Sequence, residues 1–291
     1  GQGARATGSG TTGPGQTGPP SQLPSLPPAP PPGSKDNPIK IDNYRLQGGG
    51  VSRPHRGEVA GKGYVFKSTT IPPGMSMTRN NLEAELLSEK VLNLLGVPAP
   101  KADFAWFDTG NGVEQLLRVE FVDNTLVPDE FDRRYGLNAV DGDLFKRMQV
   151  IDVLIGNGDR HKMNFLFSDN GIGKVIPIDH NMAFGTKKVF QQGETWQRCF
   201  IGNTNSPLAS HQTPEYIVCR NSIGGRIGRR DGTDSYLPII KDVQRLADPD
   251  IDRMVIDLTA DLAEPDRKLE LIEILKYRRD HLIDFFRSII W

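Results

Sequence analysis

The sequence predicts an α+β protein of two lobes, a small β-rich lobe followed by a larger, mainly helical one. Strand-like runs dominate before residue 124, one long helix-forming run interrupts them, and apolar residues at helical spacing dominate afterwards. We therefore expect an N-terminal lobe over residues 37–124 and a C-terminal lobe over 125–291. A disordered leader over residues 1–36 precedes them.

The leader is rich in Pro, Gly, Ser, Thr and Gln. Such a composition buries too little apolar surface to offset the entropy cost of ordering, so we expect disorder with polyproline character near its end. A linker or a secretion leader is the favoured interpretation. The alternative is that residues 23–33 bind a partner that recognises proline motifs.

The composition limits the classes of function. The chain has 291 residues, 37% of them hydrophobic and 24% charged, so a sizeable core is expected. A formal net charge of −1 gives no general attraction to nucleic acid or membranes, and no apolar run is long enough to predict a transmembrane segment. Only Cys199 and Cys219 are present, which favours free thiols in a reducing, intracellular compartment. The leader would also suit a bacterial effector delivered into a host cell.

The N-terminal lobe is predicted from alternating apolar runs. These predicted strands cover residues 39–46, 63–68, 102–107 and 115–122. The run 81–95 between the second and third strands is rich in helix-forming residues, and Gly96 and Pro98 follow it. The expected order is therefore strand, strand, helix, strand, strand.

The C-terminal lobe begins with a helix that leads to the most informative motif. Its buried face is predicted from apolar residues at helical spacing: Leu144, Met148, Ile151 and Ile155. Gly156 would end this helix, and Asp152 would be a structural hydrogen-bond acceptor. Further helices are predicted at 237–246, 251–262 and 264–290. The polar stretch between residues 184 and 236 contains four arginines that could meet phosphates or acidic surfaces: Arg220, Arg226, Arg229 and Arg230.

The motif itself is Asp159-Arg-His-Lys-Met-Asn164, followed by two short strands and Asp179. An Asn-Gly pair at 170–171 separates these strands and predicts a hairpin. Folding the hairpin returns Asp179 to the level of Asn164, which predicts an oxygen-lined pocket for hard cations that carry phosphates. The structural alternative is that Asp, Asn and Gly gather here only because they favour turns.

Over residues 152–184 this pattern resembles the catalytic loop of phosphoinositide 3- and 4-kinases, actin-fragmin kinase and HipA-like kinases. The order Asp-Arg-His differs from the His-Arg-Asp of ordinary protein kinases. The resemblance implies a two-lobed protein-kinase-like fold with ATP and Mg²⁺ between the lobes. By the same resemblance Asp159 is the catalytic base, and Asn164 and Asp179 are the magnesium ligands.

The resemblance also implies roles for neighbours of these residues. Arg160 and His161 would shape the loop or contact phosphate. His180, beside Asp179, is explained equally well as a residue that only hydrogen-bonds the backbone, and it is not assigned a catalytic role.

Within the N-terminal lobe, Lys67 lies on a predicted strand and is the candidate ligand of the α- and β-phosphates. Glu85 on the following helix is its expected partner, because the spacing from Glu85 to Leu95-Gly-Val-Pro-Ala-Pro resembles that of related kinases. Helical periodicity alone does not separate Glu85 from Glu83. In the kinase reading the backbone at Glu120 and Val122 would contact adenine.

A glycine triplet lies between the first two predicted strands. Its backbone amides could approach phosphate oxygens without obstruction from side chains, so Gly49, Gly50 and Ser52 are candidate phosphate contacts, with Arg53 beside them. Its spacing departs from the usual Gly-x-Gly-x-x-Gly, and the alternative is a glycine-rich loop that binds no ligand.

The favoured function is a Ser/Thr protein kinase that uses MgATP and a protein substrate, with no nucleic-acid partner. A phosphoinositide kinase is the first alternative. A pseudokinase scaffold and a nucleotidyl transferase on the same fold are the others, because a fold does not fix the chemistry that it performs.

Overall fold

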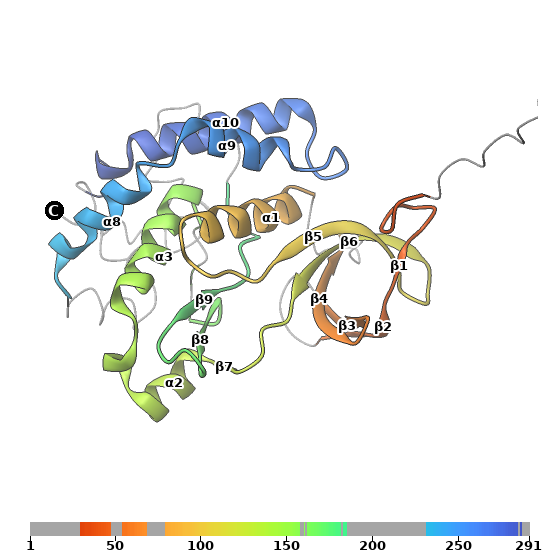
Figure 1. The fold of residues 1–291 in the computed structure, drawn as a ribbon, viewed down its shortest axis with the longest axis horizontal. Coiled ribbons are helices and arrows are strands. Elements are labelled where there is room, and N and C mark those ends of the chain that lie inside the picture. Colours follow the sequence, from red (N-terminus) through yellow and green to blue (C-terminus); the bar gives the residue numbers. More distant parts are fainter. Residues whose placement is uncertain are drawn as a thin grey trace, which may run out of the picture.

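A computed structural model of the chain describes residues 30–47, 54–68, 79–157, 160, 162–181, 183–184, 231–284 and 286. These residues form the two-lobed α+β structure that the sequence predicts, with one lobe rich in strands and the other mainly helical (Figure 1). In this part of the chain no helix has both the length and the apolar character needed to cross a membrane. The boundaries after residues 36 and 124 stay predictions.

The N-terminal lobe is a six-stranded sheet that closes on itself. Its strands, in the order β1-β5-β6-β4-β3-β2, are β1 (Ile39–Lys40), β5 (Ala102–Asp108), β6 (Val113–Glu120), β4 (Lys62–Ser68), β3 (His55–Val59) and β2 (Asp42–Leu46). Only Ile41 separates β1 from β2, so one continuous segment pairs with β5 on one side and with β3 on the other. Ile41 packs with Phe66, Phe107 and Leu116 in a small core of this barrel.

Strand β3 is an addition to the sequence prediction, which places no strand at residues 55–59. Its sequence, His-Arg-Gly-Glu-Val, lacks an apolar alternation because the central position must stay small. A Cβ atom at Gly57 would lie 2.5 Å from Cγ2 of Ile41. Antiparallel pairing with β4 along the whole strand, and not a local pattern, defines β3.

Helix α1 (Arg79–Leu94) is the helix predicted within the N-terminal lobe. The chain leaves it at Gly96, whose φ of +80° is the left-handed conformation that favours glycine. The helix contacts β5 of the barrel and also α3 (Gly142–Ile155) and α9 (Asp248–Ile256) of the other lobe. Helix α1 therefore contacts both lobes.

The C-terminal lobe combines helices with a three-stranded sheet. Besides α3 and α9, its elements are β7 (Thr125–Leu126), α2 (Pro128–Tyr135), a 3₁₀ turn (Leu137–Ala139), β8 (Phe165–Ser168), β9 (Val175–Pro177), a second 3₁₀ turn (Thr233–Ser235), α8 (Tyr236–Val243) and α10 (Pro265–Asp280). Helices α8 and α10 both contact α3. Helix α3 is therefore the centre of this lobe.

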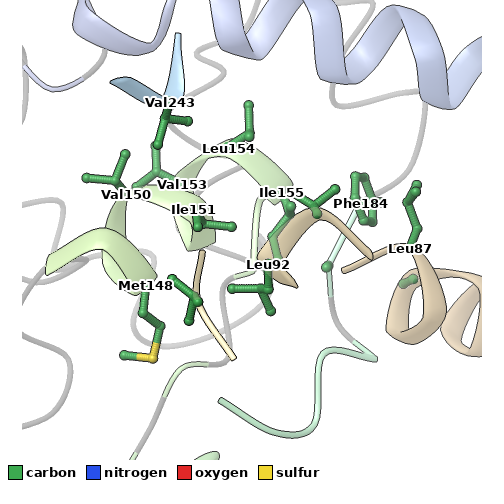
Figure 2. Close-up of a cluster of buried hydrophobic side chains, with 14 of the residues drawn as sticks. Leu87, Leu92, Met148, Val150, Ile151, Val153, Leu154, Ile155, Phe184 and Val243 are labelled. Atoms are coloured by element: carbon green, nitrogen blue, oxygen red, sulfur yellow. The ribbon is translucent and has the colours of Figure 1, made fainter. Parts of the chain in front are cut away.

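Helix α3 has the C-terminal end, at Gly156, and the buried face that the sequence predicts. The Asp141 side chain accepts a hydrogen bond from the Leu144 amide at 3.0 Å, and Gly156 ends the helix with φ of +66°. Figure 2 shows Ile151 and Ile155 of α3 in the same apolar cluster as Leu92 of α1. The last turn of α3 therefore lies in the core, directly before the motif at residues 159–164.

The last two helices are shorter than predicted. Helix α9 ends at Ile256 instead of 262, because the Lys268 ammonium from α10 binds the backbone carbonyls of Ile256, at 2.9 Å, and of Leu258. Helix α10 ends at Asp280, where His281 forms a turn before a short helical continuation. The predicted helix 264–290 is therefore interrupted.

Candidate active site

Lys67 is buried at the meeting point of three elements. It lies on β4 opposite Leu117 of β6, and only 6% of the residue is exposed. Its Nζ lies 3.1 Å from Oε1 of Glu85 on α1 and 3.1 Å from Oδ1 of Asp179, which follows β9. The structure therefore brings together three of the residues that the sequence singles out.

Glu85, and not Glu83, is the carboxylate on α1 that faces Lys67. Its second oxygen, Oε2, accepts a hydrogen bond of 2.7 Å from the backbone amide of His180. Two residues earlier on the helix, Glu83 contacts Arg267 of α10 instead. Only their tertiary contacts, with Lys67 of the barrel and with Arg267 of α10, separate the two glutamates.

The charge of Lys67 is secured by its partners. Burial alone would lower the pKa of its ammonium group, but the carboxylates of Glu85 and Asp179 outweigh burial and raise that pKa. Lys67 is therefore a fixed cation at neutral pH. The Asp179 side chain is 37% exposed, so one of the two carboxylates remains open to a ligand.

Asp179 has an unusual backbone conformation. Its φ of +56° lies in the left-handed region, which is costly for a residue with a Cβ and is often found where function requires a particular side-chain direction. The following amide is the one bound to Glu85. This hydrogen bond and the ion pair with Lys67 hold the strained residue in place.

The β8–β9 hairpin places Asn164 next to Asp179, as its Asn-Gly turn predicts. Phe165 pairs with Pro177, and the Ile178 amide donates to the Asn164 carbonyl at 3.0 Å. Asn164 is 5% exposed. An amide oxygen and a carboxylate oxygen are thus carried by adjacent backbone segments at the open end of the hairpin.

Arg160 holds the open end of the β8–β9 hairpin in place. Its guanidinium group donates two hydrogen bonds to the Asp152 carboxylate, at 2.9 and 3.0 Å, and others to the carbonyls of Asn164 and, at 2.8 Å, Ile178. Both side chains of the ion pair are buried. Arg160 thus shapes the loop, one of the two roles considered for it, and Asp152 is a structural acceptor as predicted.

His180 is buried and neutral. Burial, followed by the charges of Arg160 and Lys67, lowers its pKa well below the usual 6.5. Within the described residues its Nε2 has no hydrogen-bond partner. It lines a cavity of about 20 Å³ with Glu85 and Glu89, which is enough for one water molecule.

The two predicted adenine-contacting positions lie at the end of β6. The Glu120 amide donates to the Lys101 carbonyl at 2.9 Å, and its carboxylate forms an ion pair of 2.5 Å with Lys62. The Val122 carbonyl accepts a hydrogen bond of 3.3 Å from the Thr125 hydroxyl. Both residues are partly exposed, and their contact with adenine stays a prediction.

Several predicted residues lie outside the described part of the chain, and their roles stay predictions. They are the catalytic-base candidate Asp159, its neighbour His161, the phosphate-contact candidates Gly49, Gly50, Ser52 and Arg53, the two cysteines and the four arginines between residues 220 and 230. Of the proline motif at 23–33, only residues 30–33 are described.

Arg267 belongs to the surroundings of the site, although no sequence pattern predicts it there. Its guanidinium lies 2.7 Å from Glu83 and also contacts the Phe184 carbonyl, five residues after Asp179. No local signal could have revealed this, because 184 positions separate Arg267 from Glu83 and charged residues are common on helices.

Comparison with known proteins agrees with this geometry. Residues 84–218 match the sequence model of the phosphatidylinositol 3- and 4-kinase family, a range that includes Glu85, Asn164 and Asp179. The crystal structure of the Helicobacter pylori proinflammatory kinase CtkA aligns with a TM-score of 0.55 and 14% identity, covering 86% of this chain and 95% of that one. The chain is a kinase-like phosphotransferase.

Two further solved structures resemble this chain more weakly. A Leishmania major MAP kinase aligns with a TM-score of 0.28 and 13% identity, covering 85% of this chain and 82% of that one. A microcompartment-associated aminopropanol kinase has a TM-score of 0.33, 12% identity and coverage of 89% and 96% respectively. No curated protein matches the sequence of this kinase-like chain.

Proposed function

We propose that the protein is a Ser/Thr protein kinase that transfers the γ-phosphoryl group of MgATP to a hydroxyl group. The arrangement of Lys67, 3.1 Å from both Glu85 and Asp179, carries the proposal. A fixed ammonium held by one buried and one partly exposed carboxylate suits a site that must position phosphates and also bind a cation. The family match over residues 84–218 supports the same chemistry.

The proposed reaction assigns each residue one task. Lys67 binds the α- and β-phosphates, and Glu85 orients Lys67. Asp159 accepts the proton of the attacking hydroxyl as its oxygen forms a bond to the γ-phosphorus and the bond from that phosphorus to the β-phosphate oxygen breaks. ADP leaves with the electrons of the broken bond.

The residues at the hairpin end fit a magnesium site. Asn164 and Asp179 supply the amide and carboxylate oxygens that Mg²⁺ prefers, and nucleotide phosphates and water would complete its coordination. Among the described residues, no group of three or more His, Cys, Asp or Glu side chains could hold a metal ion. We therefore do not propose a site in which protein side chains supply all the ligands. When bound, Mg²⁺ would neutralise charge on the phosphate oxygens.

The acceptor separates the two leading candidates. A protein hydroxyl is favoured because a net charge of −1 gives the chain no general attraction to an anionic membrane surface. A phosphoinositide acceptor is the second candidate, favoured by the name of the matching family.

Labelled ATP distinguishes the proposed chemistry from its rivals. The chain is incubated with Mg²⁺, γ- or α-labelled ATP, and either a mixture of Ser/Thr peptides or phosphoinositide vesicles. We expect only the γ-label to be transferred, and only to peptide or to the chain itself. Transfer of the α-label would indicate nucleotidyl transfer, label in lipid a phosphoinositide kinase, and no transfer a pseudokinase.

Two substitutions test the assigned roles. Asp159→Asn should preserve nucleotide binding and lower kcat by about 10²- to 10⁴-fold, the usual contribution of a positioned base. Asp179→Ala should remove the magnesium-dependent part of ATP affinity measured by calorimetry. The exposed Asp261→Asn is the matched control and should change neither. Unchanged turnover in Asp159→Asn would exclude Asp159 from the mechanism.

A further inference from the structure

The two glutamates of α1 that face inward contact different neighbours, and one of them has no task in the proposed reaction. Glu83 is fully buried, and its Oε1 accepts a hydrogen bond of 2.7 Å from Nε of Arg267 on α10. Its other oxygen has no hydrogen-bond partner among the described residues. Arg267 is therefore the group that compensates a buried charge on the helix that carries Glu85.

Arg267 also contacts the segment that follows Asp179. Its Nη2 donates to the Phe184 carbonyl at 3.4 Å, and its Nη1 pairs with Glu270 of α10 at 3.1 Å. Phe184 lies in the apolar cluster between α1 and α3 (Figure 2), and its amide donates to the Ile155 carbonyl at 2.8 Å. One guanidinium group thus connects α10, α1 and Phe184 at the end of residues 179–184, which we call the Asp179 segment.

The planar fork of arginine suits this position. It stays charged when buried and can donate in several directions at once, whereas a lysine would offer one point charge. Burial raises the pKa of the Glu83 carboxyl group, and Arg267 acts against that rise. Without Arg267 the Glu83 carboxylate would be buried and uncompensated, so it could stay charged only if α1 shifted outward and exposed it to water.

A shift of α1 would reach the candidate site directly. Glu83 and Glu85 lie on the same helical turn, and Glu85 holds both Lys67 and the His180 amide. We propose that Arg267 is a positioning residue, which keeps α1 and the Asp179 segment in the register that lets Glu85 and Asp179 converge on Lys67. The effect on catalysis rests on the proposed function, whereas the effect on geometry does not.

The first variant is Arg267→Met, which keeps most of the side-chain bulk and removes the charge and the donors. We expect a lower unfolding midpoint, faster hydrogen exchange of the His180 amide and a fall in kcat of about tenfold or more, with a smaller change in KM for ATP. The control Arg253→Met removes an exposed arginine of α9 that lies 3.8 Å from Asp250, and should change none of these quantities.

A double variant separates positioning from stability. Glu83→Gln combined with Arg267→Met replaces the buried charge by a neutral amide, so the unfolding midpoint should return most of the way to wild type. The buried charge then no longer drives α1 outward, but the bridge from α1 through Arg267 to the Phe184 carbonyl remains absent, so fast exchange of the His180 amide and low kcat should persist.

The proposal is overturned if amide protection and kcat recover together with stability in the double variant, or if neither changes in Arg267→Met. Persistent loss of both in a stable double variant supports it. A wild-type chain that transfers no phosphoryl group would contradict the proposed function. Exchange of the His180 amide would still decide whether Arg267 positions α1.

Discussion

Glu85 and His180 are joined by a hydrogen bond of 2.7 Å, donated by the His180 backbone amide to the Glu85 carboxylate. The other oxygen of that carboxylate lies 3.1 Å from Lys67 Nζ. One side chain on α1 therefore holds both the cation on β4 and the backbone that presents Asp179. Any displacement of α1 weakens both contacts at once, so the position of this helix determines whether the site is assembled.

Removing the cation should leave Glu85 in an unfavourable environment. We expect Lys67→Met to lower the free energy of unfolding by about 3–5 kcal/mol at pH 7.5, the usual effect of breaking a buried ion pair on one side. Adding Glu85→Gln should recover much of this loss. Urea unfolding of the wild type, the single variant and the double variant measures both effects.

The loss in Lys67→Met should also depend on pH. Burial raises the pKa of the folded-state Glu85 carboxyl group, and Lys67 opposes that rise in the wild type. Without Lys67 the folded state binds a proton more readily than the unfolded state, so stability should increase as the pH falls through the folded pKa. An equal loss at pH 7.5 and pH 5.5 would contradict this assignment.

The buried pair Asp152–Arg160 should matter far more than an exposed pair nearby. Asp152→Ala leaves the Arg160 guanidinium buried without its carboxylate and should lower the free energy of unfolding by about 3–5 kcal/mol. Asp129→Ala removes a pair with Lys162, in which both side chains are more than half exposed, and should cost less than about 1 kcal/mol. Similar losses in the two variants would show that Arg160 does not hold the loop as inferred.

His180 should make the protein less stable in mild acid. Its pKa is well below 6.5 in the folded state, so below pH 6.5 the unfolded state binds more protons than the folded state. The free energy of unfolding therefore decreases as the pH is lowered. Between pH 7.5 and pH 5.5 this contribution should be at most about 1.4 kcal/mol. In His180→Gln, denaturant unfolding should show a smaller loss over the same interval, and an identical pH dependence would mean that His180 titrates normally.

Two glycines with similar φ angles separate backbone strain from collision. Gly173 has φ of +86° and Gly110 has φ of +80°, but a Cβ atom at Gly173 would overlap the Ala139 carbonyl, whereas the space at Gly110 is open. We expect Gly110→Ala to cost about 1–2 kcal/mol and Gly173→Ala about 1–3 kcal/mol more. Thermal unfolding of the two variants gives the difference, and equal costs would mean that the hairpin can move away from Ala139.

Elements with a local signal could be predicted from the sequence. Helix α3 repeats apolar residues at helical spacing and ends at a glycine, and the β8–β9 hairpin has its Asn-Gly turn. The adjacency of Asn164 and Asp179 follows from that hairpin alone. Strand β3 could not be predicted from its own sequence. Its central Gly57 must stay small because of Ile41, which lies between β1 and β2 and is far from Gly57 in the sequence.

Contacts between distant segments were beyond sequence patterns. Glu83 and Glu85 fit the same helix equally well, and only the tertiary structure gives one to Arg267 and the other to Lys67. The resemblance to known kinases selected Glu85 because it carries three-dimensional information that periodicity lacks. Nothing comparable pointed to Arg267, since its partners Glu83 and Phe184 come from distant segments that only the tertiary structure brings to α10.

The closure of the barrel by a single segment bears on the order of events during synthesis. Residues 39–46 leave the ribosome before the rest of the lobe, yet Ile39 pairs with Phe107. The first strand must therefore wait, unpaired on one side, until β5 has been made. Once β1 has paired, Ile39 and Lys40 cover Phe107 and Asp108 of β5, so this part of the strand edge is no longer open to a strand from another chain, and its exposure to such misassembly ends when β5 and β6 have been made.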